Sequence, residues 1–197
     1  MHTRLSVNIN KIALIRNSRG GNLPNLLKVA LDCEEFGAEG ITVHPRPDQR
    51  HIRYDDIPQL KSVLSTEFNI EGYPSGEFME LVLRNLPHQV TLVPDPPDVL
   101  TSNSGWKPKL NQDILKPVIN KLKEKGIRVS LFLDPEPEFV YQAAELGADR
   151  VELYTGLYAH RYPNNPLEAI EMHLKSAQEA LSCGLGLNAG HDLDRKS

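Results

Sequence analysis

The sequence predicts an α/β protein with the fold of a (β/α)8 barrel, and three observations lead to that prediction. Short segments rich in β-branched residues alternate with helical stretches along the chain, which is the pattern of a parallel sheet. Within the predicted strands, apolar and polar residues alternate. Glycines stand at the ends of four helical stretches, immediately before the next strand.

Seven segments have the composition of strands, at 5–10, 40–44, 69–73, 89–94, 128–134, 150–156 and 184–190. Helices are predicted between them, near 24–36, 55–65, 76–86, 112–125, 136–146 and 166–182. The glycines that end helices are Gly37, Gly126, Gly147 and Gly184, since glycine adopts the left-handed conformation without a Cβ penalty. No linker or low-complexity stretch divides the chain, so we expect one barrel domain over residues 1–197.

The alternation within the strands favours a barrel over an open sheet. In the first strand Val7 and Ile9 face one way, while Asn8 and Asn10 face the other. Under the helices of an open sheet, each unpaired polar group would cost about 1–3 kcal/mol. In a barrel these groups meet in the interior, near the end where active sites form.

The eighth strand of the barrel has no counterpart in the sequence. The chain stops at HDLDRKS, directly after the seventh predicted strand. Seven strands of an eight-stranded barrel would leave two unpaired edges. We therefore expect the barrel to be incomplete at its C-terminal end.

Composition and charge exclude several classes of protein. Apolar residues make up 40% and charged residues 24% of the chain, and the net charge is −4. A general nucleic-acid surface is therefore not expected. No apolar run approaches the roughly 18 residues that span a membrane, and MHTRLSVNIN lacks the apolar core of a signal peptide. Cys33 and Cys183 show no metal-binding spacing, which is typical of reduced thiols in a cytoplasmic protein.

Polar residues at the carboxyl ends of the predicted strands are the candidates for catalysis, because barrel enzymes place catalytic groups there. They are Asn8, Asn10, His44, Glu71, Glu152 and His191. Two histidines and two carboxylates in one interior form a general acid/base set. Burial can raise the pKa of a glutamate toward neutrality, where histidine already titrates.

A second group of residues has the chemistry of a phosphate site. The stretch GITVHPRPDQRHI carries Arg46, Arg50 and His51 on a segment stiffened by two prolines. Further candidates are Arg16, Arg19 and Thr101. Lys11 is the only lysine near the carboxyl end of a strand, so a Schiff-base aldolase is poorly supported.

These residues lie in stretches that resemble the pyridoxine 5′-phosphate synthase family of vitamin B6 biosynthesis. The stretches include VNINKIALIRNSRG (7–20), GITVHPRPDQRHI (40–52), VELYTGLYA (151–159) and LNAGHDL (187–193), and the resemblance covers essentially the whole chain. It implies a (β/α)8 barrel with extra helices, assembled as dimers within a homo-octamer. It also implies condensation of 1-deoxy-D-xylulose 5-phosphate with 3-amino-2-oxopropyl phosphate, without a metal or organic cofactor.

The resemblance also implies roles for individual residues. His44 and Glu71 match proton acceptors, His191 matches a proton donor, and Glu152 matches a carboxylate that stabilises charged intermediates. The matching contacts to substrate are Asn8 and Arg19 for the amino-ketone phosphate, and Arg46, His51 and Thr101 for the deoxyxylulose phosphate.

Three positions depart from the family pattern. Asn10 and Lys11 stand where many members have Asp-His, in the contact region for deoxyxylulose phosphate. Asp192 stands where many members have glycine, a change that matters little if the contact is through a backbone amide. We retain all three as candidates for substrate binding.

Two alternative functions remain open from the sequence. A metal-dependent sugar-phosphate isomerase or epimerase could use His44, Glu71, Glu152 and His191 as ligands. Alternatively, the chain is an inactive fragment of the synthase, or only a phosphate-binding scaffold. In each case the expected partners are small phosphorylated molecules, with neither nucleic acid nor membrane.

Overall fold

A computed structural model describes residues 2–18, 20–94, 104–190 and 193. Its strands are β1 (Ser6–Asn8), β2 (Gly40–Val43), β3 (Glu67–Gly72), β4 (Gln89–Leu92), β5 (Arg128–Leu133), β6 (Arg150–Tyr154) and β7 (Gly186–Gly190). They follow one another in sequence order in a single sheet. The pairs β1–β2, β2–β3, β5–β6 and β6–β7 are parallel. This order confirms the predicted (β/α)-barrel class, with all seven predicted strands present.

The helices are α1 (Asn10–Ser18), α2 (Leu26–Glu35), α3 (Asp56–Val63), α4 (Gly76–Asn85), α5 (Gln112–Lys123), α6 (Pro137–Glu145), α7 (Gly156–Arg161) and α8 (Pro166–Ser182), with a 3₁₀ turn η1 (Pro108–Asn111) before α5. The six predicted helices are confirmed as α2 to α6 and α8. The sequence did not predict α1, α7 or η1. The four predicted glycines have φ values of 97°, 73°, 89° and 72°, the left-handed conformation that ends a helix.

The chain divides into two compact units, residues 1–90 and residues 91–197, with the boundary inside β4. The first unit holds β1 to β3 with α1 to α4. The second holds β5 to β7 with η1 and α5 to α8. The single domain over residues 1–197 stays a prediction.

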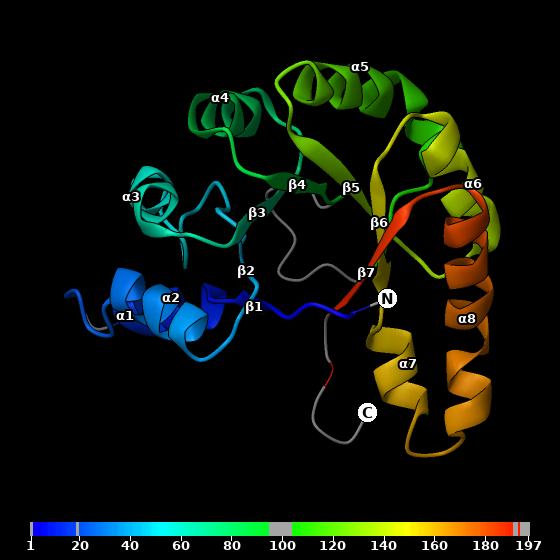
Figure 1. The fold of residues 1–197 in the computed structure, drawn as a ribbon, viewed down its shortest axis with the longest axis horizontal. Helices are drawn as coiled ribbons and strands as arrows, with labels where there is room; N and C mark the ends of the chain where they lie inside the picture. Colours follow the sequence, from blue (N-terminus) through cyan, green and yellow to red (C-terminus); the bar gives the residue numbers. More distant parts are fainter. Residues whose placement is uncertain (1, 19, 95–103, 191–192, 194–197) are drawn as a thin grey trace. The chain divides into compact units, whose positions relative to one another are not determined.

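In the first unit, consecutive helices pack side by side, α1 on α2, α2 on α3 and α3 on α4 (Figure 1). The apolar residues of β2 and β3 are fully buried, namely Ile41, Val43, Phe68 and Ile70. Each such side chain contributes about 1.5–3 kcal/mol relative to an exposed one. Burial of this apolar face leaves the alternate positions of the strands for polar residues.

Polar side chains on the other positions are hydrogen-bonded to one another across the strands. The Ser6 and Thr42 hydroxyls lie 2.8 Å apart, and Asn69 Nδ2 donates to Thr42 Oγ1 at 3.3 Å. Gln89 Nε2 donates to Asn69 Oδ1 at 3.2 Å. This row confirms a polar face on the first four strands, and its hydrogen bonds lower the cost of burying these groups.

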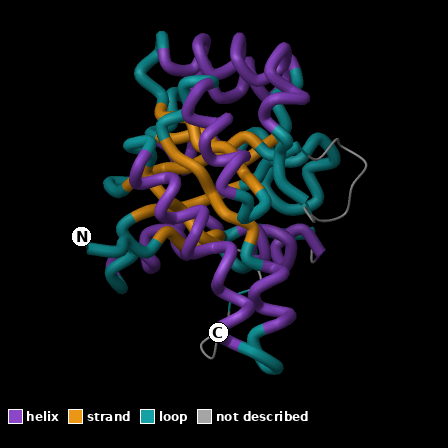
Figure 2. The backbone as a smooth tube through the Cα atoms, turned by 90° about the vertical axis from the view of Figure 1, so that its right-hand side faces the viewer, coloured by secondary structure: helices purple, strands orange, loops and turns teal. Residues whose placement is uncertain are grey.

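In the second unit, α8 packs against α6 and α7, and the strands are covered by helices in the view of Figure 2. The core includes Val129, Leu131 and Val151, all fully buried. Trp106 is 3% exposed, and its indole donates to the Leu92 carbonyl at 3.0 Å. This indole fixes the segment before η1 against the end of β4.

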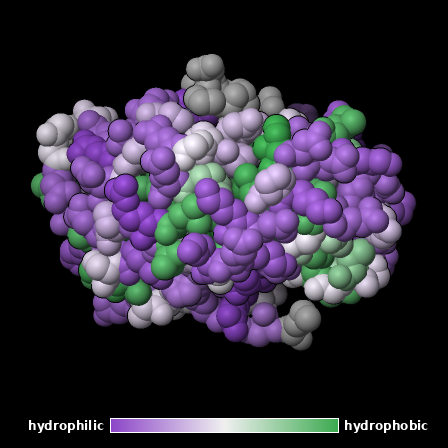
Figure 3. All heavy atoms as spheres, turned by 90° about the horizontal axis from the view of Figure 1, so that it is seen from above, coloured by the Kyte–Doolittle hydropathy of each residue, from purple (hydrophilic) through white to green (hydrophobic). Residues whose placement is uncertain are grey.

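The face of the molecule in Figure 3 is mainly hydrophilic, with apolar side chains gathered in small groups. Within the described parts of the chain, no helix combines the length and the apolar character needed to cross a membrane.

Candidate active site

His44 and Glu71 lie side by side at the carboxyl ends of β2 and β3. The strand register pairs Thr42 with Asn69, and two residues later it brings these two side chains together. His44 Nδ1 lies 4.0 Å from Glu71 Oε2, and the side chains are 13% and 15% exposed. A histidine and a carboxylate at this separation can both exchange protons with one ligand bound beside them.

Two asparagines connect the end of β1 to the same place. The Asn10 amide nitrogen donates to Asn8 Oδ1 at 3.0 Å, where the strand turns into α1. The side-chain oxygen of Asn10 accepts from the His44 backbone N–H at 2.9 Å. Both asparagines therefore belong to the His44 neighbourhood, whereas Lys11, one residue further, is exposed in the first turn of α1.

The segment after β2 brings Arg46 and His51 to this pair. Arg46 is 5% exposed, and the His51 ring centroid lies 6.2 Å from that of His44. His51 Nδ1 accepts from the Ile52 backbone N–H at 2.9 Å. The neutral His51 ring therefore carries its hydrogen on Nε2, where it can donate to an anion.

The electrostatics of this cluster keep both histidines neutral near pH 7. Burial, followed by the positive charge of Arg46 and then the neighbouring His51 and Arg50, lowers the pKa of His44 to about 3. The Glu71 carboxylate at 4.0 Å favours the protonated ring, but burial and the surrounding cations outweigh it. Burial, Arg50 and Arg46 likewise lower the pKa of His51 to about 4. A site with this surplus of positive charge is complementary to a phosphate.

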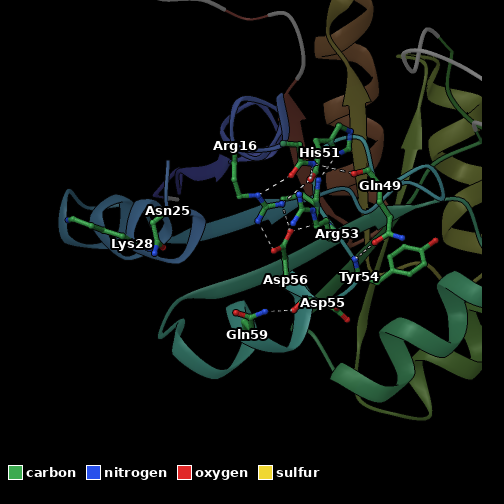
Figure 4. A network of polar contacts seen from close by, with 12 residues as sticks. Arg16, Asn25, Lys28, Gln49, His51, Arg53, Tyr54, Asp55, Asp56 and Gln59 are labelled. Atoms are coloured by element: carbon green, nitrogen blue, oxygen red, sulfur yellow. Dashed lines mark hydrogen bonds and ion pairs between the residues drawn. The ribbon is translucent and has the colours of Figure 1, made fainter. Parts of the chain in front are cut away.

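The sequence predicts that Arg16 adds to that positive charge, but in the structure Arg16 is paired with a carboxylate. Arg16 is 4% exposed, and its guanidinium forms a bidentate ion pair with the Asp56 carboxylate, at 2.7 Å and 2.9 Å (Figure 4). The carboxylate neutralises the guanidinium, so Arg16 is not a cation for phosphate. Asp56 lies 40 positions further along the chain, and no local sequence pattern signals the pairing.

Glu152 lies in the second unit, in the middle of β6. The register places it between Phe132 on β5 and Asn188 on β7. A Cβ atom at Gly190 would lie 3.9 Å from Glu152 Oε1, so the carboxylate lies over the glycine at the end of β7. The Thr155 hydroxyl donates to the Gly190 carbonyl and ties the two strand ends together.

The remaining candidates, Arg19, Thr101, His191 and Asp192, lie outside the described residues, and their roles stay predictions. Among the described residues, no three or more His, Cys, Asp or Glu side chains come together in a group that could hold a metal ion.

The fold and this cluster define a class, the (β/α)-barrel proteins with acid/base and anion-binding groups at the carboxyl ends of the strands. A model of the family described as "Pyridoxal phosphate biosynthesis protein PdxJ" matches residues 5–197. The chain belongs to this family.

Curated relatives agree with the family match. The chain is 60% identical over 191 residues to "Pyridoxine 5'-phosphate synthase" of Bacteroides fragilis (strain YCH46), covering 97% of this chain and 81% of the relative. The corresponding protein of Cytophaga hutchinsonii is 60% identical over 192 residues, with 98% and 81% covered. The chain thus spans about four fifths of these relatives' length.

Solved structures of distant proteins share the fold. A mandelate oxidase mutant in complex with benzaldehyde has a TM-score of 0.58 at 9% identity, covering 92% of this chain and 65% of that one. Dihydropteroate synthase from Stenotrophomonas maltophilia has a TM-score of 0.50 at 11% identity, with 97% and 88% covered. At such identities the likeness concerns the fold alone.

Proposed function

We propose that the chain is a pyridoxine 5′-phosphate synthase, which condenses 1-deoxy-D-xylulose 5-phosphate with 3-amino-2-oxopropyl phosphate. The name of its relatives at 60% identity supports this activity. The observation that carries the proposal is the His44–Glu71 pair at 4.0 Å, beside the buried Arg46 and the His51 ring. Acid/base groups next to a phosphate site are what this condensation requires.

The reaction consists of proton transfers around the formation of two bonds. The amine nitrogen of one substrate attacks the ketone carbon of the other, and loss of water gives an imine. Proton removal then drives elimination of inorganic phosphate, and carbon–carbon bond formation closes the ring. A second loss of water gives the aromatic ring, so that one phosphate and two waters leave for each pyridoxine 5′-phosphate. We assign proton acceptance to His44 and Glu71, proton donation to His191, and stabilisation of charged intermediates to Glu152.

Substrate binding brings His44 into a useful range for catalysis. A histidine with a pKa of about 3 is neutral but a weak base. A phosphate dianion beside Arg46 and His51 would offset the positive charge that lowers this pKa, so the pKa of His44 rises when the sugar phosphate binds. The histidine is then a stronger base with substrate than without it.

We assign the remaining contacts by family resemblance. Asn8 and Arg19 bind the amino-ketone phosphate, and Arg46, His51 and Thr101 bind the deoxyxylulose phosphate. Asn10, Lys11 and Asp192 complete the polar surroundings of the substrates. The condensation is redox-neutral, and the proposed reaction uses no metal or organic cofactor.

The proposal extends to assembly and location. We expect a homo-oligomer built from dimers, which the mass of the folded protein in solution would test. A cytoplasmic location is supported by the free thiols of Cys33 and Cys183 and by the biosynthetic family to which the chain belongs.

The experiment that tests the function is an assay of the purified 197-residue protein with both substrates, after treatment with a chelator. The proposal predicts pyridoxine 5′-phosphate and inorganic phosphate in equal amounts, and no product when either substrate is omitted. If the protein converts the sugar phosphate alone, and does so only after a divalent metal is added back, the result would favour the isomerase. A folded protein that gives no product would favour the inactive fragment.

A further inference from the structure

We propose that Arg16, Asn17 and Asp56 form a clamp that holds residues 46–53 in the conformation that receives the sugar phosphate. None of the three is assigned to the chemistry, and we infer that they act as positioning residues for Arg46 and His51. The inference rests on the proposed function, because it concerns the substrate of that same site.

The first part of the clamp is the buried pair of Arg16 and Asp56 (Figure 4). Arg16 Nη1 and Nη2 donate to the two carboxylate oxygens of Asp56 at 2.7 Å and 2.9 Å. Asp56 Oδ2 also accepts from the Arg53 backbone N–H at 2.7 Å, and Arg16 Nη2 donates to the His51 carbonyl at 3.2 Å. The pair therefore fixes the backbone of the segment at His51 and at Arg53.

The second part of the clamp is the Asn17 side chain. Its Nδ2 donates to three successive backbone carbonyls, those of Gln49 at 3.3 Å, Arg50 at 3.0 Å and His51 at 2.7 Å. Its Oδ1 accepts from Arg16 Nε at 3.1 Å. That last bond sets the amide so that its nitrogen faces the carbonyls, which makes Arg16 act on the segment through Asn17 as well as directly.

The clamped segment contains a backbone conformation that needs such support. Gln49 has φ of 48°, in the left-handed region that a residue with a side chain rarely adopts. Such a conformation is unfavourable for a residue with a side chain and persists only where surrounding contacts enforce it. The carbonyl of this residue is one of the three that Asn17 holds. Without the clamp, we expect residues 47–51 to relax away from this conformation.

The location of the clamp explains why its loss should affect one substrate. Arg46 and His51, the proposed contacts to the deoxyxylulose phosphate, lie on either side of the strained residue. Of the two proposed contacts to the amino-ketone phosphate in this unit, Asn8 lies on β1 and forms its hydrogen bond with Asn10, whereas Arg19 lies outside the described residues. The clamp therefore positions the sugar-phosphate contacts without touching Asn8.

The test is Asn17→Ala, with Asn85→Ala as its matched control. Asn85 Nδ2 also donates to a backbone carbonyl, that of Leu81 at 2.8 Å, but within α4. We expect Asn17→Ala to raise the KM for 1-deoxy-D-xylulose 5-phosphate about tenfold, which is a net effect the size of about one good hydrogen bond. The KM for 3-amino-2-oxopropyl phosphate and kcat should stay within about twofold, and Asn85→Ala should change none of the three.

Amide hydrogen exchange provides a second readout that does not depend on turnover. Peptides covering residues 47–53 should exchange faster in Asn17→Ala than in the wild type, while peptides covering β3 keep their rates. Unchanged exchange in 47–53, or an equal rise in the KM for both substrates, would overturn the clamp. A wild-type protein that makes no pyridoxine 5′-phosphate would overturn the proposed function instead, and the exchange rates would still decide whether the clamp holds the segment.

Discussion

At the scale of single residues, His44 combines burial with a positively charged neighbourhood. Burial and the charges around it lower its pKa to about 3, with Arg46 the largest charged contributor. The same neighbourhood attracts a phosphate dianion. The occupancy of the anion site and the basicity of His44 are therefore coupled, because an anion weakens the field that keeps the imidazole neutral.

This coupling predicts a ligand-dependent titration of His44. In the free protein the ring should stay neutral from pH 8 down to about pH 5, because its folded pKa is lower than the usual value of about 6.5. Adding sulfate, which stays a dianion over this range, should raise the pKa by about one pH unit or more. The measurement is the chemical shift of the His44 ring in NMR spectra, recorded against pH with and without sulfate.

Arg46→Ala is the control variant for this titration. Removing the guanidinium should raise the pKa of His44 in the free protein and weaken its response to sulfate. Identical titration of His44 with and without sulfate, under conditions where sulfate binding is observed, would contradict the coupling.

At the scale of elements, the sequence predicts those strands and helices whose apolar residues recur with the period of the element. Strands of period two, such as β2 and β3, and helices with a buried stripe, such as α4, were all found. Helix α1 was missed because its apolar residues do not form a buried stripe, with Leu14 and Ile15 exposed by 46% and 50%. Helix α7 has only six residues, too few for a helical period to be recognised.

In the site, too, the sequence predicts residues that are marked by a local pattern and does not predict pairings between distant residues. The ends of predicted strands indicated His44 and Glu71, because parallel strands place their carboxyl ends at one edge. The clamp was not predicted, because Arg16 and Asp56 are 40 positions apart and on different helices. A tertiary pairing of this kind leaves no periodic signal in the sequence, and an arginine near a strand end suggests phosphate equally well.

The segment before η1 yields a prediction about stability. A Cβ atom at Gly105 would overlap the backbone of Leu133 and Asp134 at the end of β5. Because neither the strand nor the segment can move without disturbing the Trp106 anchor, Gly105→Ala should lower the free energy of unfolding by about 1–3 kcal/mol. Gly76→Ala is the control, since a Cβ there meets nothing within 4 Å in the first turn of α4. Urea denaturation of both variants would check this. Equal midpoints would contradict the prediction, because they would show that the backbone at Gly105 or at the end of β5 shifts at little cost.

At the scale of the whole molecule, the depressed histidine pKa values make stability depend on pH. His44 and His51 have folded pKa values of about 3 and about 4, below the value of about 6.5 in an unfolded chain. Between these values the unfolded state binds more protons, so stability is present above about pH 6.5 and is lost as pH falls toward 3.

The expected loss is large enough to measure. Each pH unit between the folded and unfolded pKa of His44 is worth about 1.4 kcal/mol, so the free energy of unfolding should fall by a few kcal/mol between pH 6.5 and pH 4. His44→Ala should flatten this dependence, whereas His160→Ala, at an exposed histidine, should not. Denaturant unfolding at several pH values provides the comparison, and a wild type as stable at pH 4 as at pH 7 would count against the buried neutral histidine.

The central claim is that the His44–Glu71 pair carries proton transfer in the synthesis of pyridoxine 5′-phosphate, and the rate of product formation tests it most directly. The measurement is kcat with both substrates saturating, for the wild type, Glu71→Gln and His44→Ala, with His160→Ala as control. We predict losses of roughly 10²–10⁴ in both site variants, as for other removed acid/base groups, and an unchanged rate in the control. A folded His44→Ala or Glu71→Gln protein that forms product at the wild-type rate would contradict the account.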